Sequence, residues 1–213
     1  METTPARRYK CAVVGNGAIG KTCLVKAMTG NAAANLREYM PTGRCEVHTT
    51  TITIGETQST IEFWDTPGLE YEHFKGLPNY IDVEEELAKA YVLADVVILC
   101  FSIADPQSLR DVKDKVLLLN IDTLKLDLQG TVQWCSDLQR HRPGTPIVLV
   151  GTKMHLRDNP RMREELGISQ VPTNFEEGRK MAQDVGAVVY LECSAKTGEG
   201  VTDIWDAVVR ALG

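Results

Sequence analysis

Hydrophobic and polar residues follow two periods along this chain, and each period predicts a different kind of element. Nearly uninterrupted apolar runs, which predict strands buried on both faces, occur at 9–14, 96–101, 147–150 and 188–191. In Val47–Ile54, threonines alternate with Val and Ile, which predicts a half-exposed strand. Ser59–Trp64 has the composition of a returning strand after a turn at Gly55 and Glu56. We therefore expect six strands, two of which form a hairpin.

Helical segments are predicted between these strands. Apolar spacing after residue 22 indicates a first helix, and further helices are expected at 84–93, 107–119, 175–185 and 201–212. Strands that alternate with helices pair in parallel, because each helix carries the chain back along one face of the sheet. The expected fold is α/β, a mostly parallel six-stranded sheet with one antiparallel edge strand and helices on both faces. No repeat or linker divides the chain, so 1–213 is expected to be one domain.

Composition narrows the classes of function. The net charge of −6 gives no general affinity for nucleic acid, and no apolar run is long enough to cross a bilayer. Residues 1–10 lack the apolar core of a secretory signal, and the ending Ala211-Leu212-Gly213 has no prenylation box or basic cluster. The six cysteines are scattered and include no C-x-x-C pair, which is typical of reduced thiols. We expect a cytoplasmic protein without an encoded lipid anchor, with membrane association through partners as the alternative.

Gly15–Thr22 reads GNGAIGKT and fits the phosphate-binding template G-x-x-x-x-G-K-[ST]. The segment lies between a predicted strand and a predicted helix, as the motif requires. Its glycines let backbone N–H groups approach a phosphate, and the helix N-terminus adds favourable partial charge. Lys21 can reach the terminal phosphates, and the Thr22 hydroxyl can ligate Mg²⁺. The alternative is a glycine turn without a ligand, which the full motif in this context disfavours.

Six blocks of sequence follow one another along the chain, and they are GNGAIGKTCL, YMPT, WDTPG, CFSIADP, VGTKMHLRD and LECSAKTGEG. With these blocks in this order, the chain resembles a Ras-superfamily small GTPase, closest to the Rho/Rac branch. The segment of about 158–174 lies where Rho-type members carry an extra helical insert, and residues 1–8 form a short extension before the expected G domain.

The resemblance implies roles around GTP or GDP and Mg²⁺. Thr42 would ligate Mg²⁺ and sense the γ-phosphate, and Tyr39 would close over the phosphates. Asp65 would hold Mg²⁺ together with Thr22, usually through water, and the Gly68 N–H would approach the γ-phosphate. Lys21 and Thr42 would support catalysis. The phosphate loop would contribute Gly15, Asn16, Gly17, Ala18, Ile19, Gly20, Lys21, Thr22 and Cys23.

The base would be recognised by two later loops. Thr152 and Lys153 begin the first, and the Lys153 stem would pack along the purine. Ser194, Ala195 and Lys196 resemble the second, in which the Ala195 N–H would read the guanine carbonyl. Effectors and regulators would bind through switch loops at about 31–45 and 66–90, which order with GTP and relax with GDP.

Two departures from the family pattern bear on activity. Leu69 stands where the family usually has the Gln that orients the attacking water, so we expect slow hydrolysis and a dominant GTP state. The alternative to a natural Leu69 is an engineered substitution that traps the GTP state. Pro67 is also unusual in the Rho branch and stiffens this loop.

The base site departs as well. His155 occupies the position of the Asp whose carboxylate accepts two hydrogen bonds from guanine, and a neutral imidazole offers one acceptor. Asn35 corresponds to the aromatic residue that usually stacks on the base. We expect rapid nucleotide exchange or relaxed base specificity, and a compensating shift elsewhere in the pocket is the alternative.

Two stretches, 76–86 and 116–131, are longer than in typical Rho-type members. The second carries an apolar stripe at helical spacing, which packs on the domain itself or binds a partner. The stripe consists of Leu117, Ile121, Leu124 and Leu128.

Three functions stay open. They are a slow GTP-dependent switch, a pseudo-GTPase scaffold, and a P-loop enzyme for another nucleotide. The switch motifs disfavour the third.

Overall fold

The computed structural model describes residues 7–30, 44–54, 57–68, 90, 93–112 and 144–213. Within this part of the chain, one six-stranded sheet has the order β2-β3-β1-β4-β5-β6. β2 pairs antiparallel with β3 at one edge, and the other neighbours are parallel. The predicted fold is therefore confirmed. The strands are β1 Arg8–Val14, β2 Glu46–Ile54, β3 Thr57–Asp65, β4 Val96–Ser102, β5 Ile147–Thr152 and β6 Val189–Glu192.

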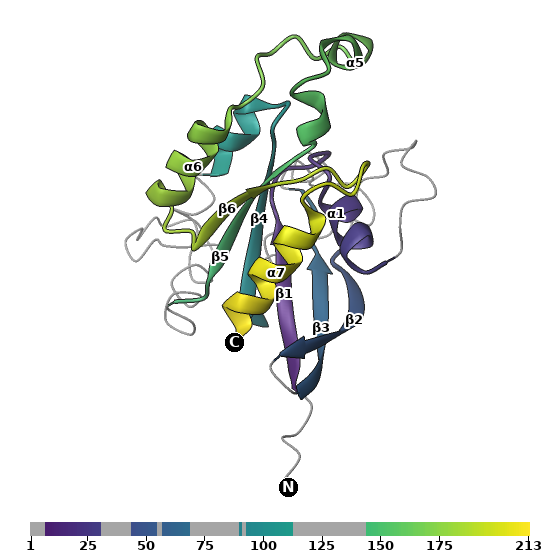
Figure 1. Ribbon diagram of the computed structural model, residues 1–213, viewed down its shortest axis with the longest axis vertical. Helices are drawn as coiled ribbons and strands as arrows, with labels where there is room; N and C mark the ends of the chain where they lie inside the picture. The colour runs from purple at the N-terminus through teal and green to yellow at the C-terminus, as the bar shows by residue number, and fades with distance from the viewer. Residues whose placement is uncertain (1–6, 31–43, 55–56, 69–89, 91–92, 113–143) are drawn as a thin grey trace, which may run out of the picture.

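Helices cover both faces of this sheet (Figure 1). α1 (Lys21–Met28) and α7 (Val201–Leu212) pack on one face, where Leu24 and Ile204 join the buried side chains of β1 and β3. Residues 106–112, which are helical, and α6 (Phe175–Asp184) cover the opposite face. Burial on both faces explains why β4 is buried at every position, whereas edge strand β2 alternates between exposed and more buried residues.

The predicted helices agree with the described residues. α7 has the predicted bounds, and α6 ends one residue early, with Val185 as its C-cap. The described part of the predicted helix at 107–119 is helical, as are residues 90 and 93 of the segment at 84–93. The remainder of both segments, the turn at 55–56 and the stretches 76–86 and 116–131 lie outside the described residues. No helix in the described ranges is long and apolar enough to span a membrane.

Two short elements follow β5. η2 (Met154–Leu156) is a single 3₁₀ turn, and α5 (Pro160–Glu165) lies within the segment predicted as an insert. Asn159 caps α5 by accepting a hydrogen bond from the Met162 N–H, and Pro160 occupies the first helical position. At α6, Asn174 and Glu177 form a reciprocal capping box.

A buried polar network fixes the region between η2 and β6. The Arg157 guanidinium donates to both carboxylate oxygens of Glu192, at 2.5 and 2.6 Å, and to the Thr173 carbonyl. The Tyr190 hydroxyl donates to Glu192 at 2.6 Å, and its ring lies so close to α6 that a Cβ on Gly178 would come within 2.1 Å of it. The ends of β5 and β6 are therefore held together by charge-assisted hydrogen bonds and close packing.

Candidate nucleotide-binding site

The phosphate loop connects the carboxyl end of β1 to the first turn of α1 (Figure 1). Gly15 has φ 145°, and a Cβ there would lie 2.4 Å from the Cys100 carbonyl oxygen. Gly20 has φ 103° and Ala18 has φ 56°, so the loop turns through left-handed conformations. α1 begins without a side-chain N-cap and without an acidic residue in its first turn. The loop thus presents backbone N–H groups and a positive helix end to an anion.

Lys21 places its ammonium group within this loop. The residue is 6% exposed, and Nζ donates to the carbonyls of Gly15 at 2.9 Å and Asn16 at 2.7 Å. A buried cation in a glycine-rich loop at a helix N-terminus is a favourable partner for a phosphate.

Thr22 and Asp65 meet where β3 ends against α1. The Thr22 hydroxyl donates to Asp65 Oδ2 at 2.6 Å. Asp65 is fully buried, and its Oδ1 has no hydrogen-bond partner among the described residues. Burial raises the pKa of this carboxyl, while the bond from Thr22 and the charge of Lys21 oppose the rise. A buried carboxylate oxygen without a partner beside a hydroxyl fits a hard divalent cation such as Mg²⁺.

The segment after Asp65 is tied to β1. The Thr66 hydroxyl donates to the Val13 carbonyl at 2.8 Å, and Thr66 is fully buried. This bond fixes the start of Asp65–Gly68 beside the phosphate loop, and Gly68 lies partly buried at the end of the described segment.

The loop after β5 also contacts the phosphate loop. The Thr152 hydroxyl lies 2.5 Å from the Ile19 carbonyl and 2.9 Å from the Phe101 carbonyl. Lys153 has φ 59°, and its Nζ donates to the Ala18 carbonyl at 2.5 Å. Burial lowers the pKa of Lys153. The loop that begins at Thr152 and the phosphate loop, which lie more than a hundred residues apart in the sequence, are thus hydrogen-bonded to each other at the carboxyl ends of the strands.

A family model for the Ras family matches residues 10–127 and 115–213. The chain belongs to the Ras family. Proteins of this family are small GTPases, switches that bind GTP and GDP, typically with Mg²⁺, and act through effectors and regulators. The phosphate loop, Lys21 and the Thr22–Asp65 pair of this Ras-family domain agree with that chemistry.

His155 and Ser194 bring the two predicted base loops of the Ras-family domain together. His155 Nδ1 lies 2.8 Å from Ser194 Oγ, which also accepts a hydrogen bond from the Thr197 N–H at 3.2 Å. Ser194 is fully buried, and His155 is partly buried. Burial lowers the pKa of His155, and the charges of Lys196 and Lys153 lower it further. Ala195 is partly buried and Lys196 is exposed beside them.

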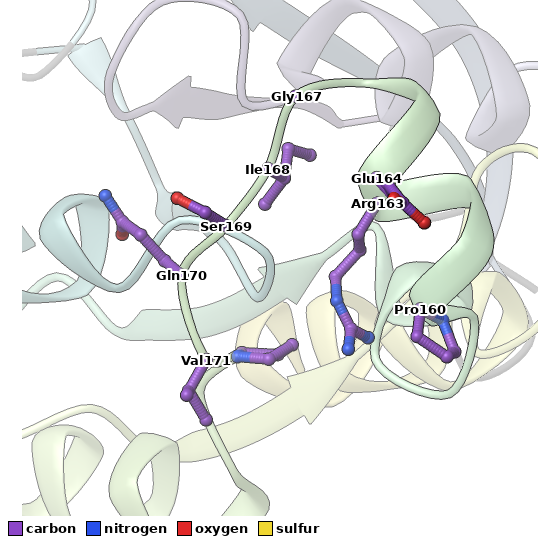
Figure 2. Close-up of a pocket in the computed structure, with 9 residues that line it drawn as sticks. Pro160, Arg163, Glu164, Gly167, Ile168, Ser169, Gln170 and Val171 are labelled. Carbon is purple, nitrogen blue, oxygen red and sulfur yellow. The ribbon is translucent and has the colours of Figure 1, made fainter.

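α5 is attached to both base loops. The Arg163 guanidinium donates to the Leu156 carbonyl at 2.6 Å and also to the Arg157 carbonyl, and Lys196 Nζ lies 3.8 Å from Met162 Sδ. Figure 2 shows the pocket beside α5, into which Ile168 points from the following loop. This pocket is lined by residues of α5 and of 167–172, and it contains no residue of the phosphate loop.

One contact was missed by sequence reasoning. Asn16 Nδ2 donates to Asp111 Oδ2 at 2.6 Å, and Gln107 Nε2 donates to Asp111 Oδ1 at 2.7 Å. The bond joins the phosphate loop to the helical segment 106–112. A single Asp on a helix gives no sequence signal for such a partner.

Several predicted site residues fall outside the part of the chain that the structure describes. They are Asn35, Tyr39, Thr42 and Leu69. Cys23 and the other predicted members of the phosphate loop are described and lie in one continuous segment.

Proposed function

We propose that this chain is a Rho-like small GTPase, a GTP/GDP-dependent switch whose intrinsic hydrolysis is slow. The observation that carries the nucleotide site is the Thr22–Asp65 pair at 2.6 Å beside the buried ammonium group of Lys21. This arrangement supports phosphate and Mg²⁺ binding at the carboxyl ends of the strands, where ligands bind in parallel α/β sheets. α5, within the segment that resembles a Rho-type insert, supports the Rho-like part of the proposal.

In this proposal, each residue contributes positioning or charge. Backbone N–H groups of residues 15–20 bind the phosphates, and Lys21 neutralises charge that develops on them. Thr22, Thr42 and Asp65 would hold Mg²⁺, which would stabilise negative charge on the phosphates. Thr152 and Lys153 keep the base loop against the phosphate loop through their bonds to Ile19 and Ala18.

The slow reaction follows from Leu69. An apolar side chain cannot hydrogen-bond a water molecule, so the positioning component of catalysis is lost while charge stabilisation stays. We propose that the GTP form dominates when GTP is available. The switch loops 31–45 and 66–90 would then bind effectors for longer than those of a fast GTPase.

A pseudo-GTPase scaffold is the second candidate, favoured by His155 in the base site. The geometry of Lys21 and of the Thr22–Asp65 pair argues against a scaffold that binds no nucleotide, because such a protein has no need of a buried cation and a buried carboxylate at this position.

The test is nucleotide binding by the purified chain. Denaturing the protein and identifying any released nucleotide shows what it carries. Lys21→Ala should abolish binding of a fluorescent guanine nucleotide, whereas Lys26→Ala, on the same helix, should leave binding unchanged. Equal binding by the unmodified chain and by Lys21→Ala would overturn the assignment.

A further inference from the structure

The hydrogen bonds of Ser194 determine which ring nitrogen of His155 carries a proton. Ser194 Oγ accepts the Thr197 N–H, so its own hydroxyl proton requires an acceptor. The other contact of Oγ among the described residues is His155 Nδ1 at 2.8 Å. Because Ser194 is fully buried, leaving this proton without an acceptor would be costly. The hydroxyl therefore donates to Nδ1, and the neutral ring carries its proton on Nε2.

His155 Nε2 is the nitrogen that remains open to solvent. The buried polar side-chain atoms without a hydrogen-bond partner in the described ranges are His48 Nε2, Asp65 Oδ1 and Thr173 Oγ1. His155 Nε2 is not one of these atoms and has no hydrogen bond in the described part of the chain, so this nitrogen is accessible to solvent. Burial lowers the pKa of His155, and the neighbouring charges of Lys196 and Lys153 lower it further, so the ring is favoured in its neutral form. The site thus presents a single N–H donor at this position.

We propose that Ser194 and His155 make this site select a purine with a hydrogen-bond acceptor at its 2-position, a 2-oxopurine nucleotide such as a xanthosine phosphate, over guanine. The proposal rests on the proposed function, in which phosphates bind residues 15–22 and the base lies against the loops after β5 and β6. Guanine carries N–H donors at both positions 1 and 2, so the Nε2–H donor of His155 would face donors. A 2-oxo group replaces the amino donor with an acceptor.

The 6-oxo group of the purine should still be required. The proposed contact from the Ala195 N–H to this oxygen is common to guanine, hypoxanthine and xanthine. Adenine carries an amino donor there and should bind weakly. Hypoxanthine has no group at position 2, so it separates the contribution of the 2-substituent from that of the rest of the base.

The first experiment compares dissociation constants for the xanthosine, inosine and guanosine diphosphates with Mg²⁺. For the unmodified chain, we expect xanthosine to bind about tenfold more tightly than guanosine, with inosine between them, which is the effect of about one neutral hydrogen bond. His155→Asp supplies two charged acceptors and should reverse the order, favouring guanosine by about a hundredfold. Arg179→Ala, on the exposed face of α6, is the matched control and should keep the order of the unmodified chain.

The second experiment observes the tautomer directly by ¹⁵N–¹H correlation NMR of the histidine ring, with the His155 signals assigned through their loss in His155→Gln. We expect protonated Nε2 and unprotonated Nδ1. Ser194→Ala removes the donor to Nδ1 and should mix the two tautomers and reduce the preference for xanthosine over guanosine toward unity, while Ser194→Thr, which keeps the hydroxyl, should restore both.

The outcomes distinguish this inference from the proposed function. Tight guanosine binding with rejection of xanthosine by the unmodified chain would overturn the inference and leave the GTPase assignment intact. A proton on Nδ1 would overturn it in the same way. Binding of none of the three nucleotides would overturn both.

Discussion

The Thr22 hydroxyl donates a hydrogen bond to Asp65 Oδ2 across 2.6 Å, which joins the first turn of α1 to the last residue of β3. Asp65 is fully buried, and its second oxygen has no partner among the described residues. The fold therefore holds a carboxylate where water cannot solvate it. Such a group destabilises the empty protein and becomes favourable when a cation neutralises it.

The first prediction concerns Asp65→Asn. Because burial raises the pKa of Asp65 in the folded protein, the charged carboxylate costs stability above that pKa, and the cost disappears as the pH falls and the group is protonated. Without nucleotide and with EDTA, Asp65→Asn should therefore unfold at a higher temperature at pH 7.5, by about 2–4 °C for each 1 kcal/mol relieved. The difference in unfolding temperature between Asp65→Asn and the unmodified chain should shrink toward acidic pH, and thermal unfolding across a pH series measures it.

The same substitution should weaken the nucleotide complex. Adding Mg²⁺ should slow nucleotide release strongly in the unmodified chain and only weakly in Asp65→Asn, because a neutral amide is a poor Mg²⁺ ligand. An Asp65→Asn protein that is less stable when empty, or that keeps its full Mg²⁺ response, would contradict this account.

The second prediction tests the bond between Asn16 and Asp111 by exchanging the two residues. Asn16→Asp alone places two carboxylates at a contact of 2.6 Å and should destabilise the domain by about 1–2 kcal/mol. Adding Asp111→Asn restores a donor and an acceptor in reversed order and should recover most of that loss. Asp111→Asn alone should have a small effect, since two amides can still bond. Chemical denaturation of the four proteins measures the coupling, and simple additivity would rule out the contact.

The third prediction compares two Arg–Glu pairs. Arg157→Ala leaves Glu192, whose side chain is 7% exposed, without its main partner, and should cost about 3 kcal/mol. Arg179→Ala breaks an exposed pair with Glu176, whose side chains are 57% and 70% exposed, and should cost less than about 0.5 kcal/mol. Urea unfolding of both variants gives the comparison. Similar costs would mean that the Arg157 network is not a major support of the loop between β5 and β6.

The fold could be predicted from the sequence because its strands carry strong local signals. β4 is apolar from Val96 to Phe101 because helices cover both faces of the sheet, and β2 alternates because it forms an edge. The phosphate loop was also predictable, because phosphate binding restricts residue type at fixed spacing, as the left-handed Gly15 and Gly20 show. The proximity of Thr22 and Asp65 could be predicted as well, because the phosphate loop and Asp65 both follow strands whose carboxyl ends meet at the same edge of the sheet.

Other contacts could not be predicted, because they depend on how distant polar side chains are oriented. Asn16 and Asp111 are separated by 95 positions, and neither position has a residue type that requires the other. His155 was expected to weaken guanine recognition, but its hydrogen bond with Ser194 depends on the relative placement of η2 and the loop after β6. The periodicity of hydrophobic residues shows which face of a helix or strand is buried. It contains no information on which distant polar side chains form a hydrogen bond.

The last prediction is that Leu69→Gln accelerates hydrolysis. Phosphoryl transfer to water requires charge stabilisation, which Lys21, Thr22 and Mg²⁺ are proposed to supply, and a group that places the water in line. The phosphate loop contains no Arg that could replace this group, and Leu69 has neither a donor nor an acceptor. Restoring Gln should raise the single-turnover rate by about tenfold or more, the scale of one positioning contact. The rate should be measured on protein preloaded with γ-labelled nucleotide, using whichever of GTP or XTP it binds more tightly.

Leu69→Asn is the matched control, because it has the same amide on a shorter side chain and should recover less of the rate. Some P-loop GTPases with an apolar residue at this position hydrolyse GTP by other means, in some cases after dimerisation. The assay should therefore be repeated over a range of protein concentrations. If the unmodified chain matches Leu69→Gln at every concentration, another group positions the water. If it matches only at high concentration, a second copy supplies that group, and slow hydrolysis is a property of the monomer alone.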